Sequence, residues 1–198
     1  MTDHPIIFTG PMVRAILEGR KTQTRRIIKP QPIWDSEWGG NGEWIYTNRY
    51  GYEFPLSEYA SNYSKGDMLW VKEAWSHGWP MNAGDVLPPE PAEGAVAITY
   101  RETGKVPFGS HGRWRSPIFM PRWASRITLK VTDVRVQRLQ DISERDAEAE
   151  GVAPLYAQGW PSREHIGGFR KAWCLIHSIG SWEENPWVAA ISFERVQP

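Results

Sequence analysis

The stretch PIIFTGPMVRAILEGRKTQTRR, residues 5–26, determines how the fold begins. Its apolar start, Ile6 to Thr9, predicts a short strand. Gly10 and Pro11 then begin a helix, since proline is favoured in the first helical turn. A buried stripe at helical spacing is formed by Met12, Val13, Ile16 and Leu17. Gly19 suits the left-handed residue that closes such a helix, so the polar segment after it begins a new element.

The later regular elements alternate with irregular sequence. Periodicity and capping signals predict strands at 68–73, 96–100, 127–136 and 187–196, and helices at 143–150 and 168–177. In the long strand, the apolar parity changes at Thr132-Asp133, which indicates a bulge or a tight turn. Residues 30–65 and 76–118 are rich in Pro, Gly and aromatic residues without a clean period and are interpreted as two insertions.

These elements favour an α+β fold. Five or six short strands with three helices, two of them late in the chain, predict a small β-barrel with helices packed on it. A doubly wound sheet is not supported, because strands and helices do not alternate. We expect residues 1–198 to form one domain.

Composition excludes several classes of protein. The 198 residues carry 23 Lys plus Arg and 23 Asp plus Glu, so the zero net charge argues against a scaffold that coats nucleic acid through bulk charge. A single cysteine, Cys174, excludes an internal disulfide and a cysteine-based zinc site. The first residues lack a signal-peptide pattern, and no apolar run approaches the roughly 18–20 residues of a membrane span, so we expect a cytoplasmic protein without a membrane partner.

Charge is nevertheless segregated along the chain. Residues 11–30 hold six cationic residues against one acidic residue, and residues 113–138 hold seven against one. Residues 139–151 reverse the balance, with five acidic residues against one Arg. Such clusters could form a phosphate-binding patch or simply solvated faces of helices and strands.

Common catalytic and cofactor motifs are missing. The chain has no phosphate-loop, GxGxxG or GxSxG motif, and its five histidines show no metal-ligand spacing. We therefore expect neither a metal nor another cofactor.

The segment that follows Gly19 contains the strongest candidates for catalytic residues. Lys21 and Thr24 would point to opposite faces of a continuous strand, but a turn after Gly19 lets them converge. A lysine whose pKa falls on burial can take a proton from a hydroxyl nucleophile. The alternative is that Arg20 and Lys21 cap the preceding helix while Thr24 is an ordinary strand residue.

Four segments resemble the ASCH-domain family, a PUA-like β-barrel family, and especially its longer phage and prophage members. They are residues 5–26, GDMLWVKEAW at 66–75, residues 120–152, and NPWVAAISFERV at 185–196. The two insertions lie outside this resemblance. ASCH domains are linked to RNA binding, to nucleic-acid cleavage and to deacylation of modified nucleosides.

The resemblance implies a catalytic set. In the small bacterial ASCH enzymes that hydrolyse N4-acetylcytidine, a Lys and a Thr of a GRKTxTxR segment act with a Glu of the acidic helix. By motif these are Lys21, Thr24 and Glu150. One departure is Arg25, which stands where those enzymes have an apolar residue. Thr24 would attack the acyl carbon or orient a water, Lys21 would act as base or electrostatic partner, and Glu150 would shuttle a proton.

Seven further residues are candidates for substrate binding. A carboxylate can accept hydrogen bonds from a base edge, an aromatic ring can stack on a base, and arginine binds phosphate. The candidates are Arg20, Arg26, Glu73, Trp75, Arg122, Trp123 and Arg126. Glu73 could equally form a strand-end salt bridge, with Trp75 and Trp123 in the core.

The leading hypothesis is a hydrolase that removes the acyl group from N4-acylated cytosine nucleosides or nucleotides. One alternative is a non-catalytic module that binds RNA or single-stranded DNA through the same residues. A nuclease that uses the same basic cleft is the third. The sequence does not fix the oligomeric state.

Overall fold

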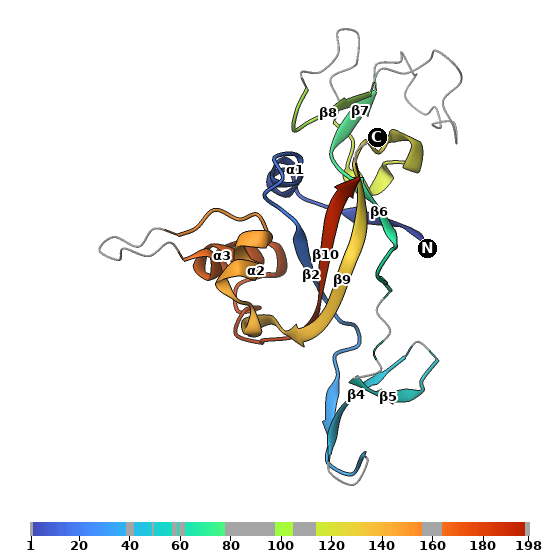
Figure 1. Cartoon of the computed structure of the whole chain (residues 1–198), viewed down its shortest axis with the longest axis vertical. Helices are drawn as coiled ribbons and strands as arrows, with labels where there is room; N and C mark the ends of the chain where they lie inside the picture. Colours follow the sequence, from blue (N-terminus) through green and yellow to red (C-terminus); the bar gives the residue numbers. More distant parts are fainter. Residues whose placement is uncertain are drawn as a thin grey trace. The chain divides into compact units, whose positions relative to one another are not determined.

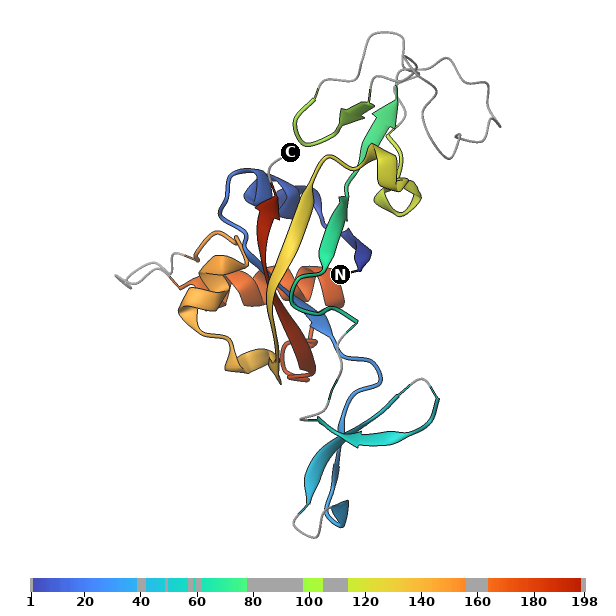
Figure 2. The same cartoon turned by 45° about the vertical axis from the view of Figure 1, so that its right-hand side comes forward.

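The computed structural model describes residues 2–38, 42–48, 50–56, 59, 62–77, 98–104, 114–155 and 164–196. The chain divides into two compact units. The first comprises residues 1–19, 67–130 and 195–198, and the second comprises residues 20–66 and 131–194. Figures 1 and 2 show the elements along the chain.

In its described residues, the first unit contains one α-helix and short strands. Its elements are β1 (Asp3–Ile7), α1 (Gly10–Leu17), β6 (Met68–Lys72), β7 (Trp75–His77), β8 (Ile98–Tyr100) and the first residues of β9 (Thr128–Arg138). β1 runs parallel to β6, which pairs antiparallel with β9. The strand expected at 96–100 is observed from Ile98, and residues 96–97 lie outside the described residues.

Where the structure describes it, the second unit contains the rest of β9, two α-helices and the 30–65 insertion. Its other elements are β2 (Gln23–Ile27), β3 (Ile33–Asp35), β4 (Glu43–Thr47), β5 (Glu53–Pro55), α2 (Glu144–Ala149), α3 (His165–His177) and β10 (Trp187–Val196). β3, β4 and β5 form a three-stranded antiparallel sheet within the insertion. The segment interpreted as irregular therefore has regular structure.

Five strands form one sheet in the order β1-β6-β9-β10-β2, in which neighbours are hydrogen-bonded. The sheet is mixed, because the β1–β6 pair is parallel and the β10–β2 pair antiparallel. The expected α+β class is confirmed. Within the described part of the chain, β1 and β2 stand at the two ends of this order.

The parity change in β9 does not come from a tight turn. The strand runs without interruption from Thr128 to Arg138, so the tight turn predicted at Thr132-Asp133 is wrong, and the bulge, the other expected cause, stays a prediction. Val131 is fully buried, whereas Val134 and Val136 line a cavity with aromatic residues of the β3–β5 insertion. Apolar residues of both parities in β9 are therefore packed against other parts of the chain.

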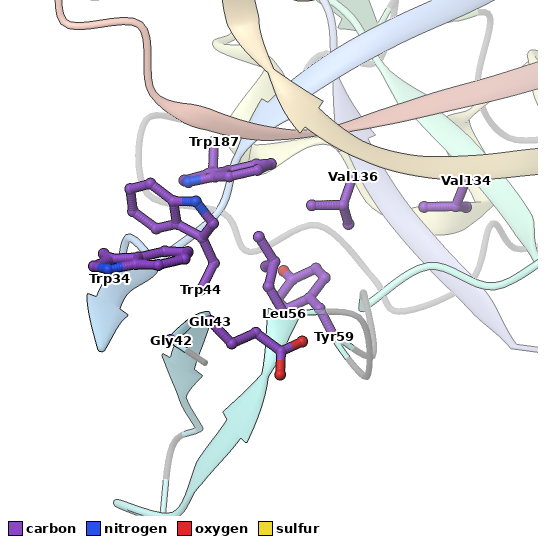
Figure 3. A pocket seen from close by; sticks show the side chains of 9 residues that line it. All are labelled: Trp34, Gly42, Glu43, Trp44, Leu56, Tyr59, Val134, Val136 and Trp187. Atoms are coloured by element: carbon purple, nitrogen blue, oxygen red, sulfur yellow. The ribbon is translucent and has the colours of Figure 1, made fainter. Parts of the chain in front are cut away.

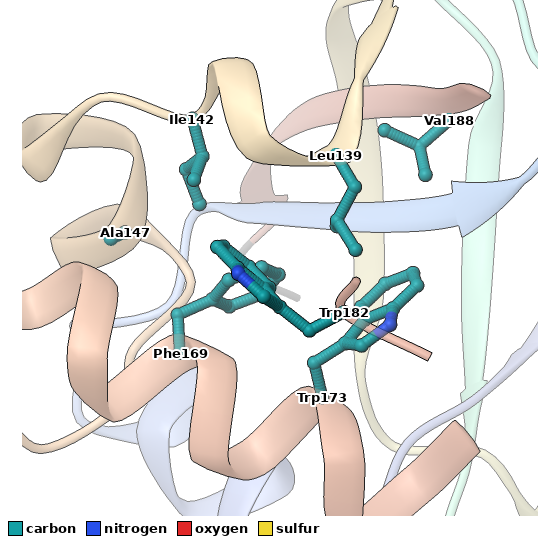
Figure 4. Packing of buried hydrophobic residues seen from close by; sticks show 7 residues of the cluster. All are labelled: Leu139, Ile142, Ala147, Phe169, Trp173, Trp182 and Val188. Carbon is teal, nitrogen blue, oxygen red and sulfur yellow. The ribbon is translucent and has the colours of Figure 1, made fainter. Parts of the chain in front are cut away.

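The core of the second unit lies between its helices and strands. α2 and α3 pack together, as Figures 1 and 2 show, and Figure 4 shows the aromatic side chains of α3 directed into this core. The cluster consists of Leu139, Ile142, Ala147, Phe169, Trp173, Trp182 and Val188. Burial of these large apolar side chains fixes α2, and therefore the residue that follows it, against the sheet.

Candidate functional site

Lys21 is placed by the turn that follows α1. Gly19 has a positive φ of 76°, which glycine adopts without strain, and the chain changes direction there. Lys21 then forms an isolated antiparallel bridge with Glu150, and the Thr22 amide donates to the Ala149 carbonyl at 2.8 Å. The start of β2 is thereby fastened to the end of α2.

Glu150 is placed by the capping of α2. The hydroxyl of Ser143 accepts a hydrogen bond from the Asp146 amide at 3.1 Å, which confirms the predicted N-cap. Six residues later the helix ends, and Glu150 is its C-cap residue. A carboxylate at this end faces the negative pole of the helix dipole, so it needs nearby cations.

Lys21 supplies one of those cations. Its Nζ donates to the Glu150 side chain at Oε2 (2.8 Å), to the Glu150 carbonyl (3.0 Å) and to the Gln23 carbonyl (2.7 Å). An ammonium has three N–H groups, so these contacts match its full donor capacity. The arrangement is that of a charged lysine held against a charged carboxylate.

Arg25 supplies the second cation, a role that the sequence analysis missed. Its Nη1 donates to Glu150 Oε1 at 2.9 Å and to Gln23 Oε1 at 2.7 Å, and its Nη2 lies 3.4 Å from Asp146 Oδ2. Lys21, Gln23 and Arg25 are two residues apart, so a strand places them on one face. That alternation was the signal available in the sequence. We call Lys21, Gln23, Arg25, Asp146 and Glu150 the buried ion-pair cluster.

The cluster is shielded from water. The side chains of Lys21 and Arg25 are 0% exposed and that of Glu150 is 3% exposed. Burial lowers the pKa of Lys21, and the adjacent Glu150 carboxylate opposes this effect. Burial alone would raise the pKa of Asp146, but hydrogen bonds from Arg135 and Gln23 outweigh it, so the pKa is lowered. Two cations and two carboxylates thus neutralise each other; Lys21, Arg25 and Glu150 are buried, and Asp146, with a side chain 17% exposed, lies at the edge of the cluster.

Thr24 lies in the same strand as the cluster. It is buried and pairs with Ile191 of β10. It alternates with Gln23 and Arg25, so β2 directs its side chain to the other face. The three acceptors of the Lys21 ammonium described above do not include the Thr24 hydroxyl. The structure therefore joins Lys21 to Glu150 and leaves Thr24 beside them along the strand.

Arg20 and Arg26 flank this cluster. Arg20 Nη1 donates to the Gly151 carbonyl at 2.9 Å. Arg20 and Lys21 thus bind carbonyl groups at the end of α2, whereas the alternative interpretation placed them at the preceding helix. Arg26 is partly buried; burial lowers its guanidinium pKa, against the influence of Tyr63 and Glu150.

The other candidates lie in the first unit. Glu73 is buried, and Arg126 binds it in bidentate fashion, with Nε and Nη2 each 2.9 Å from a carboxylate oxygen. Arg126 also lies 4.0 Å from the centroid of the Tyr100 ring. Trp75 is fully buried in a core cluster. These contacts match the salt-bridge and core alternatives for Glu73 and Trp75.

Arg122 and Trp123 belong to a 3₁₀ turn of the first unit. Arg122 Nε donates to Asp3 Oδ2 at 2.8 Å. Trp123 packs edge-on against Trp75, with ring centroids 6.3 Å apart. The substrate-binding roles of these residues stay predictions.

Two absences concern only the described residues. Among them, no three His, Cys, Asp or Glu side chains gather in a way that could hold a metal ion. No helix in this part of the chain has the length and apolar character needed to cross a membrane.

Comparisons with known proteins give two similar structures. No protein-family model and no curated protein matches the chain. An ASCH domain from Lactobacillus crispatus JV V101 superposes with a TM-score of 0.45 at 10% identity, covering 98% of this chain and 79% of that one. Protein EF3133 from Enterococcus faecalis V583, of DUF984, gives a TM-score of 0.40 at 13% identity, covering 99% and 80%. The first match names the family that the sequence motifs resemble; likeness at this level is not evidence of shared activity.

Proposed function

We propose that this protein is a hydrolase that removes the acyl group from N4-acylated cytosine nucleosides or nucleotides. The observation that carries the proposal is the buried contact between Lys21 Nζ and Glu150 Oε2 at 2.8 Å. It pairs two of the three residue types that the ASCH resemblance assigns to catalysis, although they stand 129 positions apart in the chain.

The reaction transfers the acyl group from nitrogen to oxygen. The oxygen of Thr24, or of a water that it orients, attacks the acyl carbon, and the bond from that carbon to N4 breaks. Glu150 takes up the proton lost by the attacking hydroxyl and gives it to the leaving amine; because the Thr24 side chain points to the other face of β2, a water has to carry the proton between them. With Thr24 as nucleophile, water then hydrolyses the acyl ester, so the products are the carboxylic acid and the unmodified cytosine.

The observed contacts favour one of the two roles considered for Lys21. Its three N–H groups all have acceptors, which fits a lasting positive charge better than a free base. In this role Lys21 stabilises negative charge that develops on the acyl oxygen. Glu150, with one oxygen on Lys21 and the other on Arg25, then carries the proton.

The test follows release of cytidine from N4-acetylcytidine by chromatography. Thr24→Val keeps the branched shape of the side chain and replaces the hydroxyl by a methyl group, so we expect a folded protein whose rate falls by roughly 10²–10⁴. Thr24→Ser should keep measurable activity. Thr22→Val, at an exposed threonine two residues earlier, is the matched control and should behave as wild type. No cytidine from wild type, or equal rates for the two valine variants, would refute the proposal.

A non-catalytic module that binds RNA or single-stranded DNA is the second candidate. The observation that favours it is the complete burial of the Lys21 side chain, which is typical of a structural ion pair. Binding of labelled RNA that weakens steeply with salt, together with no release of cytidine, would identify this function instead.

A further inference from the structure

The second unit contains a cavity walled by aromatic side chains, which the proposed reaction does not use. Its volume is about 530 Å³, within the range of small-molecule sites. Figure 3 shows indole rings on one side and aliphatic side chains of β9 on another. The lining residues are Trp34, Gly42, Glu43, Trp44, Leu56, Tyr59, Val134, Val136 and Trp187.

Three tryptophans form a continuous aromatic wall. Trp34 of β3 and Trp44 of β4 are direct partners in the antiparallel register, with ring centroids 5.8 Å apart and an interplanar angle of 69°. Trp44 meets Trp187 of β10 at 5.4 Å and 67°. Because both contacts are edge-to-face, the rings do not stack on one another. Trp34 remains 55% exposed, so part of the wall is open to a ligand.

The wall is held in place before any ligand arrives. The Arg138 guanidinium lies 4.5 Å from the Trp44 ring centroid and 4.7 Å from that of Trp187. Gly42 has a φ of 73°, and a Cβ there would lie 2.6 Å from Cζ2 of Trp34. Glycine is therefore required for the close approach of the Trp34 ring. A preorganised wall reduces the entropy lost on binding.

Polar groups accompany the aromatic surface. The guanidinium of Arg138 brings a positive charge beside two of the rings, and the Glu43 carboxylate belongs to the lining. The buried Nε1 of Trp187 has no hydrogen-bond partner among the described residues. The lining thus combines flat apolar faces with a carboxylate, and a guanidinium lies against two of the rings.

We propose that this cavity binds a nucleobase, stacked against Trp34 and Trp44. A base offers a flat π-face to the indoles, and the donors at its edge suit the Glu43 carboxylate of the lining. An aliphatic ligand would use the rings but not the carboxylate. The inference does not depend on the proposed hydrolase, because none of the residues given a catalytic role lines the cavity.

The experiment uses the full chain and 2-aminopurine, a fluorescent base whose emission falls when it stacks on indole. One arm titrates 2-aminopurine riboside, and the other titrates a single-stranded oligonucleotide with one internal 2-aminopurine. Quenching in both arms with similar affinity assigns the site to free nucleosides. Much tighter binding of the oligonucleotide assigns it to a base within a strand.

Two variants and a control connect binding to the cavity. Trp34→Ala removes a stacking surface from a largely exposed position, so the protein should fold and bind roughly 5- to 150-fold more weakly. Gly42→Ala should also weaken binding, because its methyl group displaces the Trp34 ring. Tyr52→Ala, at a 66% exposed aromatic of the same insertion outside the lining, should bind as wild type. Absence of quenching in both arms, or equal loss in Trp34→Ala and Tyr52→Ala, would overturn the proposal.

Discussion

Replacement of Glu150 by glutamine tests the electrostatics of the buried ion-pair cluster most directly. The carboxylate lies 2.8 Å from Lys21 Nζ and 2.9 Å from Arg25 Nη1. With an effective dielectric constant of about 20, each contact corresponds to a gross attraction of about 6 kcal/mol. Desolvation of the three charges offsets most of this sum. The net effect is therefore much smaller than the total attraction.

The amide removes the carboxylate charge that faces both Lys21 and Arg25, while Arg25 keeps its ion pair with Asp146 at 3.4 Å. Removing one member of a buried ion pair typically costs about 3–5 kcal/mol. We expect a loss of this size, which lowers Tm by roughly 6–20 °C in a chain of this length. Thermal and denaturant unfolding would measure it, and hydrogen exchange in α2 would show whether the loss is local. Glu148→Gln, at an exposed position of the same helix, should change stability by less than about 0.5 kcal/mol.

The loss should depend on pH in a defined direction. Burial places the pKa of Lys21 in the folded state below its ordinary value of 10.5, and without the carboxylate that opposed this effect it falls further. The unfolded chain then holds a proton that the folded protein has released, so folding becomes more favourable as pH rises toward 10.5. The deficit of Glu150→Gln should therefore be smaller at alkaline pH than at neutral pH.

A second substitution separates charge from packing. The double variant Glu150→Gln with Lys21→Met removes one of the uncompensated cations and should recover part of the lost stability. Equal stability of Glu150→Gln and Glu148→Gln, or further loss in the double variant, would refute the electrostatic account.

Gly168→Ala and Glu73→Gln should both lower the stability of the protein, and each has a comparison variant with a different expected result. Gly168→Ala places a Cβ in collision with the Ala153 carbonyl oxygen, so it should destabilise the protein by about 1–3 kcal/mol. Gly167→Ala meets only side-chain atoms of Leu155 and Glu164 and should be neutral or stabilising; thermal unfolding measures both variants. Glu73→Gln should cost about 1–3 kcal/mol, because it leaves Arg126 without a charged partner. Combining it with Arg126→Met should recover part of that loss in denaturant titrations, and a purely additive result would contradict the explanation.

Much of the regular structure could be predicted from apolar spacing and capping residues. α1 begins at Gly10 as expected, and Ser143 caps α2 through its hydroxyl. These signals are local: each depends on a few consecutive residues and backbone groups. The β3–β4 hairpin was not predicted, because short strands rich in tryptophan have little periodicity.

The candidate site could be predicted only in part. The pairing of Lys21 with Glu150 came from the family resemblance, because nothing local in the sequence relates positions so far apart. Arg25 was treated as a departure from the family pattern, yet it binds the other oxygen of the same carboxylate. Its role depends on where β2 lies relative to the end of α2, and the packing of the whole unit sets that position. The cavity beside Trp34 also could not be predicted, because it forms only when distant segments of this unit pack together.

The packing of β9 against the β3–β5 insertion limits how this chain can be shortened. The sequence alone suggests that residues 30–65 could be deleted without effect on the fold, since that insertion lies outside the family resemblance. It would, however, uncover Val134, Val136 and Trp187 together. A contiguous apolar patch of this kind promotes self-association. Any minimal version for crystallography or engineering should therefore carry polar replacements at these three positions.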